Sequence, residues 1–239
     1  VYIQQNSRQP GVNDQMNERL NYSVARPAES VLASNKVLKN TYLLLSATLA
    51  FSAVMALVSM AIAVPPWMYL VSVIGAMVLG MFVLPRTANS STGLWVIFLI
   101  TGLLGFGLGS ILTGYLSLPN GPQIIATAFG GTGIIFLGLS GYALTTKRDF
   151  SFMGGFLFAG MLVVILAMLA NLFLTIPALS LAISGAIILL MSGFILFDTS
   201  RIISGGETNY IFATYGLYLS LFNIFVALLQ ILGIMSGDD

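Results

Sequence analysis

The sequence predicts an all-α integral membrane protein with seven transmembrane helices. The chain of 239 residues is 57% hydrophobic and only 7% charged, and its mean hydropathy of +0.96 lies well outside the range of soluble domains. Its apolar residues form blocks of about 20 residues, the length that an α-helix needs to cross a hydrocarbon core of about 30 Å. Because the strands of a membrane barrel would give short alternating runs instead, helical spans are expected.

The first 38 residues precede the first apolar block. They are rich in Gln, Asn, Ser and Arg and show no sustained apolar period, a composition that predicts a flexible tail. The segment also lacks the apolar core and cleavage site of a signal peptide, so the first span is expected to direct insertion. The expected organisation is a flexible cytoplasmic tail over residues 1–38, a seven-helix transmembrane domain over 39–235, and a short acidic end over 236–239.

The apolar blocks place the seven spans near residues 41–64, 67–84, 94–116, 123–145, 151–174, 178–199 and 210–233. Two kinds of short connection alternate between them. Three connections carry no charge, at Pro65-Pro66, Leu118 to Pro122 and Pro177. The other three hold all the charged loop residues, which are Arg86, Lys147, Arg148, Asp149, Arg201 and Glu207.

The basic residues all fall on one side of the predicted membrane. All nine Lys and Arg lie on the side of the amino-terminal tail, so the positive-inside rule predicts that the tail is cytoplasmic and that Asp238 and Asp239 lie outside. An odd number of spans is required for this arrangement, in agreement with the seven blocks. Since the loops on the far side are too short to form a folded domain, function is expected within the bilayer or at its cytoplasmic face.

The residue inventory excludes several chemistries. The chain has no cysteine and no histidine, which removes disulfides, thiol nucleophiles and imidazole ligands. A net charge of +1 gives no support for binding nucleic acid. The segment Gly138-Leu139-Ser140-Gly141 matches the signature around the nucleophile of rhomboid intramembrane proteases, but a serine nucleophile needs a base and no histidine is available. We therefore expect no enzyme, no cofactor and no catalytic or metal site.

Glycines are frequent in the third, fourth and fifth spans. Small residues about one turn apart, such as Gly105 and Gly109, let two helices approach closely. The pattern predicts tight helix packing, and the alternative is a set of helices that slide or bend.

Asp198 is the only acidic residue inside a long hydrophobic segment, and an ionisable group at membrane depth costs a few kcal/mol. It follows Pro177 by about 31 Å along a helix axis, which places it at the cytoplasmic edge of the hydrocarbon core. Two interpretations remain open. Arg201 lies three residues further on the same helix face and could form an ion pair with Asp198, or the carboxylate could lie in a polar crevice where it binds a cation or titrates.

The last span carries three uncharged polar residues, Ser220, Asn223 and Gln230. Their spacing of one and two helical turns places them on one face. Such residues usually bond to neighbouring helices, so this face is expected to point into the protein.

Several blocks in order resemble the bacterial branch of the transmembrane Bax-inhibitor motif family. The resemblance runs from about Ser34 to Gly233 and includes Y-A-L-T-T-K-R-D-F-S-F-M-G-G (142–155), P-A-L-S-L-A-I-S (177–184), I-L-F-D-T-S (195–200), G-G-E-T-N-Y-I (205–211) and L-Y-L-S-L-F-N-I-F (217–225). It implies a seven-helix membrane protein in which six helices surround a central last helix.

The resemblance implies two different activities. In one bacterial branch, members associate with the membrane-anchored ATP-dependent protease FtsH and its HflK/HflC partners. They restrain proteolysis as poor substrates, and the cytoplasmic tail is the segment on which the protease pulls. Other members are pH-sensitive calcium leak pathways gated by two aspartates on the last two helices. Asp198 matches the first aspartate, but Ser220 stands at the second position, and a lone carboxylate lacks the mutual repulsion that lets a close pair titrate. Glu207 lies too far along the loop to be assumed as a replacement.

The leading hypothesis is therefore a non-enzymatic protein of the bacterial cytoplasmic (inner) membrane that binds and modulates FtsH in membrane-protein quality control. The alternative is a calcium or cation leak channel with Asp198 at its cytoplasmic mouth. The residues expected to line or gate such an ion path are Asp198, Arg201, Glu207, Ser220 and Asn223.

Overall fold

The computed structural model describes residues 12–146 and 148–236, with side chains from residue 35 on, and within these ranges it contains helices and no strand. The elements are α1 (Val12–Ala61), α2 (Met68–Val78), the π-helical turn η1 (Leu79–Val83), α3 (Leu84–Thr87), α4 (Ser91–Leu116), α5 (Gly121–Thr146), the 3-10 turn η2 (Ser151–Met153), α6 (Gly154–Leu174), α7 (Pro177–Ile203) and α8 (Tyr210–Ser236).

Seven helical segments are long and apolar enough to cross a membrane, so the predicted fold class is confirmed. They cover Asn35–Ala61, Met68–Thr87, Ser91–Leu116, Gly121–Thr146, Ser151–Leu174, Pro177–Ile203 and Tyr210–Ser236. The second segment combines α2, η1 and α3. Each observed segment overlaps one predicted span, with ends that differ by a few residues because the helices continue past the apolar core.

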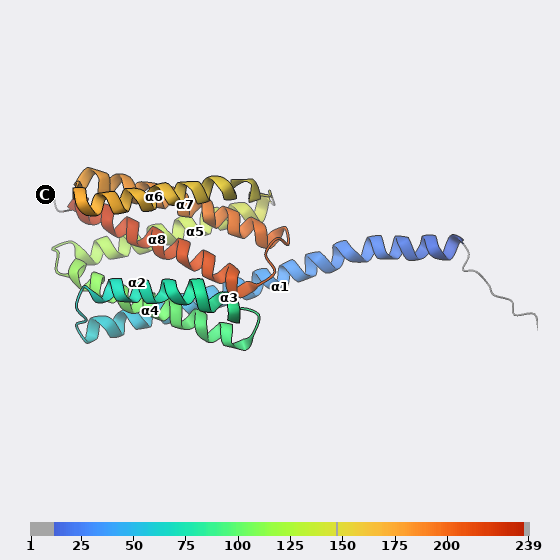
Figure 1. The fold of residues 1–239 in the computed structure, drawn as a ribbon, viewed down its shortest axis with the longest axis horizontal. Helices are drawn as coiled ribbons and strands as arrows, with labels where there is room; N and C mark the ends of the chain where they lie inside the picture. The colour runs from blue at the N-terminus through green and yellow to red at the C-terminus, as the bar shows by residue number, and fades with distance from the viewer. Residues whose placement is uncertain (1–11, 147, 237–239) are drawn as a thin grey trace, which may run out of the picture.

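The last helix runs between two groups of helices (Figure 1). α1, α2 and α4 lie on one side of α8, and α5, α6 and α7 lie on the other. α8 contacts α1, α4, α5 and α7 directly, whereas α2 packs against α4 and α6 packs against α7. The last helix is thus central, and α2 and α6 lie behind its direct neighbours. Leu217 and Ile224 of α8 are fully buried in the core that both groups share.

The connections alternate between two ends of the bundle. The loops after α3, α5 and α7 lie at the end from which α1 extends (Figure 1), and they include Arg148 and Glu207. We call this the basic end. The connections after α1, α4 and α6 lie at the opposite end, which we call the far end, and none of their residues is charged.

The second span contains a π-helical turn at Leu79–Val83. Pro85 follows at the start of α3, and a proline inside a helix removes one backbone hydrogen bond and clashes with the preceding turn. The wider turn accommodates this proline. Gly80 within it also leaves room for the Tyr215 hydroxyl of α8, which a methyl group at position 80 would overlap.

The amino-terminal region differs from the sequence-based expectation. α1 begins at Val12 and continues without a break into the first span, and Figure 1 shows its first part leaving the bundle as a rod. Composition predicted a flexible tail over residues 1–38. Once packed turns have nucleated a helix, each further residue of fair helix propensity adds to it at low cost. Pro27 within this extension removes one backbone hydrogen bond, and we have no physical account of how the helix continues through it. Residues 1–11 of the predicted tail lie outside the described residues.

Candidate functional site

Asp198 lies between α7 and α8 at the basic end. It precedes the end of α7 at Ile203 by five residues. Its half-buried side chain points at Gly216 of α8, where an added methyl group would lie 2.6 Å from Oδ2. Because Gly216 has no side chain, the carboxylate can lie directly against the central helix.

Arg201 forms its ion pair with Glu207 and not with Asp198. Arg201 Nη2 lies 3.6 Å from Glu207 Oε2 and donates a hydrogen bond of 3.2 Å to the carbonyl oxygen of Gly206. The guanidinium also lies 5.4 Å from the ring centroid of Phe197. Within the described residues this is the one ion pair, so the Asp198–Arg201 pair that the i+3 spacing allowed is not formed.

The side chain of Asn209 holds two loops of the basic end together. Asn209 accepts hydrogen bonds from the N–H groups of Ile211 at 2.8 Å and Phe212 at 3.3 Å, which caps the start of α8. Its Nδ2 donates to the carbonyl oxygen of Ala88 at 3.0 Å and to Asn89 Oδ1 at 2.8 Å. The α7–α8 loop is thereby joined to the α3–α4 loop. Sequence reasoning missed this role, although an Asn directly before an apolar helix is a recognisable capping signal.

The α5–α6 loop is fastened to α7 beside Asp198. The buried Ser200 hydroxyl accepts a hydrogen bond of 3.2 Å from the N–H of Phe150. In the same loop, hydrogen bonds from the side chain and backbone of Ser151 lower the pKa of the exposed Asp149 carboxyl. The basic end is therefore an ordered set of loops around the Asp198 region.

The three polar residues of α8 do not form one network. Ser220 is buried, as predicted for a face that points into the protein. Asn223 is half-buried, and its Nδ2 donates a hydrogen bond of 2.8 Å to the carbonyl oxygen of Leu219 in the same helix. Gln230 Oε1 accepts a hydrogen bond of 2.8 Å from Ser184 Oγ of α7. Of the three, only Gln230 makes a side-chain hydrogen bond to a neighbouring helix among the described residues.

A buried layer of hydroxyl groups joins α1, α4 and α8. Ser52 Oγ and Tyr218 Oη lie 2.6 Å apart in a hydrogen bond, and Tyr218 also donates to the carbonyl oxygen of Thr101 at 3.3 Å. One turn closer to the basic end, Thr214 donates to the carbonyl oxygen of Thr41 at 3.3 Å. Sequence reasoning missed this layer because isolated Ser and Thr in an apolar span carry no period of their own.

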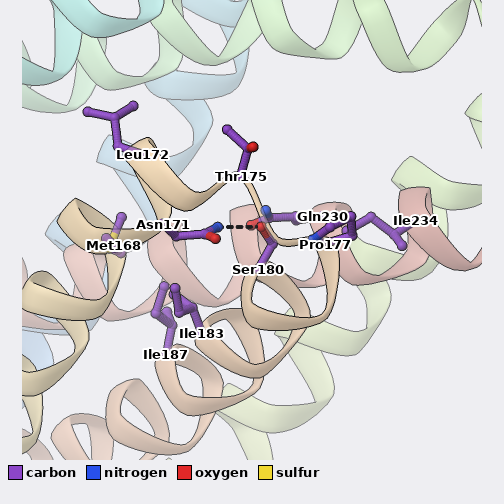
Figure 2. Close-up of a pocket in the computed structure, with 10 residues that line it drawn as sticks. All are labelled: Met168, Asn171, Leu172, Thr175, Pro177, Ser180, Ile183, Ile187, Gln230 and Ile234. Carbon is purple, nitrogen blue, oxygen red and sulfur yellow. Dashed lines mark hydrogen bonds between the residues drawn. The ribbon is translucent and has the colours of Figure 1, made fainter.

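Two cavities occur elsewhere on the bundle. One, of 550 Å³, lies at the far end between α6, α7 and α8, and Figure 2 shows its lining residues. The other, of 740 Å³, is an apolar groove between α1 and α4 lined by residues that include Phe51, Trp95 and Gly102. Asp198 lines neither of them.

No group of three or more acidic residues gathers to hold a metal ion in the part of the chain that the structure describes.

Ser140, the serine of the protease-like segment, is buried and hydrogen-bonded to the Tyr42 hydroxyl. This serine therefore serves as a contact between α1 and α5.

A family model described as inhibitor of apoptosis-promoting Bax1 matches residues 34–237. The match begins where the sequence resemblance begins and covers all seven spans.

Three relatives are similar over nearly their whole length. A protein of Escherichia coli named Modulator of FtsH protease YccA is 53% identical over 209 residues, which cover 87% of this chain and 94% of that protein. Inner membrane protein YccA from a second Escherichia coli strain matches with the same identity and coverage. A membrane protein of Vibrio cholerae is 53% identical over 211 residues, or 88% of this chain and 95% of that protein. These matches confirm the resemblance to the bacterial branch and identify that branch as the YccA-like one.

Proposed function

Because this chain belongs to the family of inhibitors of apoptosis-promoting Bax1, we propose that it is a non-enzymatic inner-membrane protein that binds and modulates the protease FtsH. The observation that carries the proposal is the 53% identity to the relative named Modulator of FtsH protease, over 94% of that relative. The family match over residues 34–237 covers all the spans and the loops between them.

The proposed orientation follows the charges at the two ends of the bundle. Arg86, Arg148 and Arg201 lie at the basic end, and the far-end connections carry no charge. The positive-inside rule then favours a cytoplasmic basic end. In this orientation the α1 extension that begins at Val12 projects into the cytoplasm, where we place the ATP-dependent part of the protease, with the HflK/HflC complex as an associated partner.

The test is co-purification from native membranes in mild detergent. We expect the full chain to recover FtsH, and we expect deletion of its gene to change the turnover of membrane substrates of the protease. Failure to recover FtsH together with unchanged turnover would contradict the proposal.

The α1 extension supplies a matched pair of variants. A chain that lacks residues 1–34 keeps the seven spans, which begin at Asn35, and is expected to stay in the membrane but to lose its effect on turnover. Replacing residues 1–34 with an unrelated helical sequence of equal length separates a need for length from a need for these residues. If the truncated chain changes turnover to the same extent as the full chain, the extension is not the segment through which FtsH is modulated.

A cation leak is the second candidate, and one observation favours it. The Asp198 carboxylate is not neutralised by Arg201, because Arg201 pairs with Glu207. A half-buried carboxylate that has no ion-pair partner among the described residues is a candidate cation contact at the cytoplasmic end of an ion path. The proposed lining would add Arg201, Glu207, Ser220 and Asn223, with calcium as the cation.

Reconstituted vesicles test this candidate. The parent chain is expected to pass calcium, and Asp198→Asn is expected to reduce the flux at both acidic and neutral pH. Asp149→Asn is the control, because it removes an exposed acidic charge at the same end of the bundle and outside the proposed lining. Equal background flux from the parent and from Asp198→Asn would remove the candidate.

A further inference from the structure

The far end of the bundle contains a cavity of 550 Å³ where α6 turns into α7. Its volume falls in the range of about 300–1,000 Å³ that is typical of small-molecule sites. Figure 2 shows that three helices and the α6–α7 turn supply its walls. The lining residues used below are Met168, Asn171, Leu172, Ser180, Ile183 and Gln230.

The polar groups of the α6–α7 turn beside the cavity form hydrogen bonds with one another. Asn171 Oδ1 accepts a hydrogen bond of 3.0 Å from the N–H of Ile176, and its Nδ2 donates to Ser180 Oγ at 2.7 Å. Thr175 ends α6 in the left-handed conformation with φ of 49°, and Pro177 begins α7 without an N–H group. Asn171 and Ser180 therefore hold the turn in shape, and this part of the wall is rigid.

Two lining polar side chains remain available: Thr175 is exposed at the turn, and the half-buried one is Gln230. Its Oε1 accepts the hydrogen bond from Ser184, which fixes the plane of the amide, and within the described residues its Nε2 makes no hydrogen bond. An amide N–H away from water is destabilised unless an acceptor reaches it. Gln230 lies six residues before the end of α8 at Ser236, or about 9 Å along the helix axis. That depth is close to the border between the headgroup region and the hydrocarbon core.

The other lining residues indicate which kind of ligand fits the cavity. No charged side chain lines the cavity, so it does not fit a free anion or a phosphate group. Leu172, which is 71% exposed, and Met168, which is 50% exposed, form a lipid-facing mouth on α6. Ile183 of α7 continues this apolar wall. An uncharged hydrogen-bond acceptor attached to an alkyl chain fits these surroundings, and the acyl ester of a membrane lipid has that chemistry.

We propose that this cavity binds one diacyl glycerophospholipid of the adjoining leaflet, with an ester carbonyl accepting a hydrogen bond from Gln230 and an acyl chain along Leu172, Ile183 and Met168. The site lies at the far end, and the proposed contact with the protease lies at the basic end. The lipid site and the protease contact are therefore tested separately.

The experiment uses the full chain in nanodiscs of phosphatidylethanolamine and phosphatidylglycerol. The phosphatidylethanolamine carries a photoreactive diazirine near the ester of one acyl chain, and adducts are located by peptide mass spectrometry. We expect more adduct at Met168, Leu172 and Ile183 than at Leu169 and Phe173, which lie exposed at the same depth on α6 outside the cavity. Equal labelling of both sets would show only the surrounding lipid and would overturn the proposal. So would cavity labelling by a single-chain fatty acid probe with none by the phospholipid.

Two variants test the assigned contacts. Gln230→Leu keeps most of the side-chain volume and removes the amide, so the ratio of cavity to outer-face adduct should fall roughly fivefold. Leu172→Trp fills the mouth and should lower the same ratio, whereas Leu166→Trp, on the same helix outside the cavity, should leave it unchanged. Circular dichroism and monodisperse elution check that each variant folds. If Gln230→Leu does not fold, Leu172→Trp against Leu166→Trp decides, and a ratio equal to the parent's in both tryptophan variants would overturn the proposal.

Discussion

α4 and α5 have the same length and the same number of glycines, but the surroundings of those glycines differ. Each has 26 residues and six glycines, and each spans the bundle once. On α4, added methyl groups at Gly102, Gly105, Gly107 and Gly109 would overlap neighbouring helices. On α5, added methyl groups at Gly130, Gly133, Gly138 and Gly141 would meet no atom within 4 Å.

The difference shows that a glycine-rich span need not be a closely packed span. The predicted tight packing is confirmed for α4, where Gly105 faces backbone of α1 at Ser52, and it is wrong for most glycines of α5. α4 lies between α1, α2 and α8, whereas α5 has one face outside the bundle. Substitutions at the two kinds of glycine should therefore differ in their effect on stability.

Gly105→Ala should have the largest effect. Its methyl group would overlap the carbonyl oxygen of Ser52, and a backbone atom inside a packed helix cannot move aside. We expect a loss of about 2–3 kcal/mol in the free energy of unfolding, measured by SDS unfolding in mixed micelles. A change below about 0.5 kcal/mol would contradict close α1–α4 packing.

Gly216→Ala should destabilise less, by about 1–2 kcal/mol. The obstacle here is Asp198 Oδ2, 2.6 Å from the added methyl group, and the end of a side chain can rotate away. Because the conflict involves only these two residues, Asp198→Ala in the same chain should restore part of the loss. A double variant whose loss equals the sum of the two single losses would argue against contact between them.

Tyr218→Phe tests the hydroxyl layer along the α4 side of α8. It removes the hydrogen bonds to Ser52 and to the carbonyl oxygen of Thr101, so we expect a loss of about 1 kcal/mol. Tyr210→Phe is the control, since the Tyr210 hydroxyl makes no hydrogen bond within the described residues. Equal stability of the two variants would mean that the layer contributes nothing.

Gly130→Ala on α5 should have the smallest effect and the opposite sign. The added methyl group meets no atom within 4 Å, and Ala favours helix over Gly by up to about 1 kcal/mol. We expect unchanged or slightly increased stability in the same unfolding assay. A loss as large as that of Gly105→Ala would show that α5 packs against something in the membrane.

The candidate site was predictable in part. The place of Asp198 near the basic end of α7 followed from its distance along the helix from Pro177. The partner of Arg201 did not follow, because i+3 spacing favoured Asp198, whereas the loop after α7 returns Glu207 to within 3.6 Å of the guanidinium. The capping and cross-loop contacts of Asn209 depend in the same way on how two loops meet.

The sequence by itself determined the helical class, the seven spans and the separation of charge between the two ends. These properties depend on hydropathy and length, which act locally along the chain in a bilayer. Only the tertiary structure decided which glycines are contact points, which carboxylate pairs with Arg201, and where the far-end cavity lies. In an apolar span nearly every residue is compatible with lipid, so hydropathy does not distinguish a helix face that meets lipid from one that meets another helix.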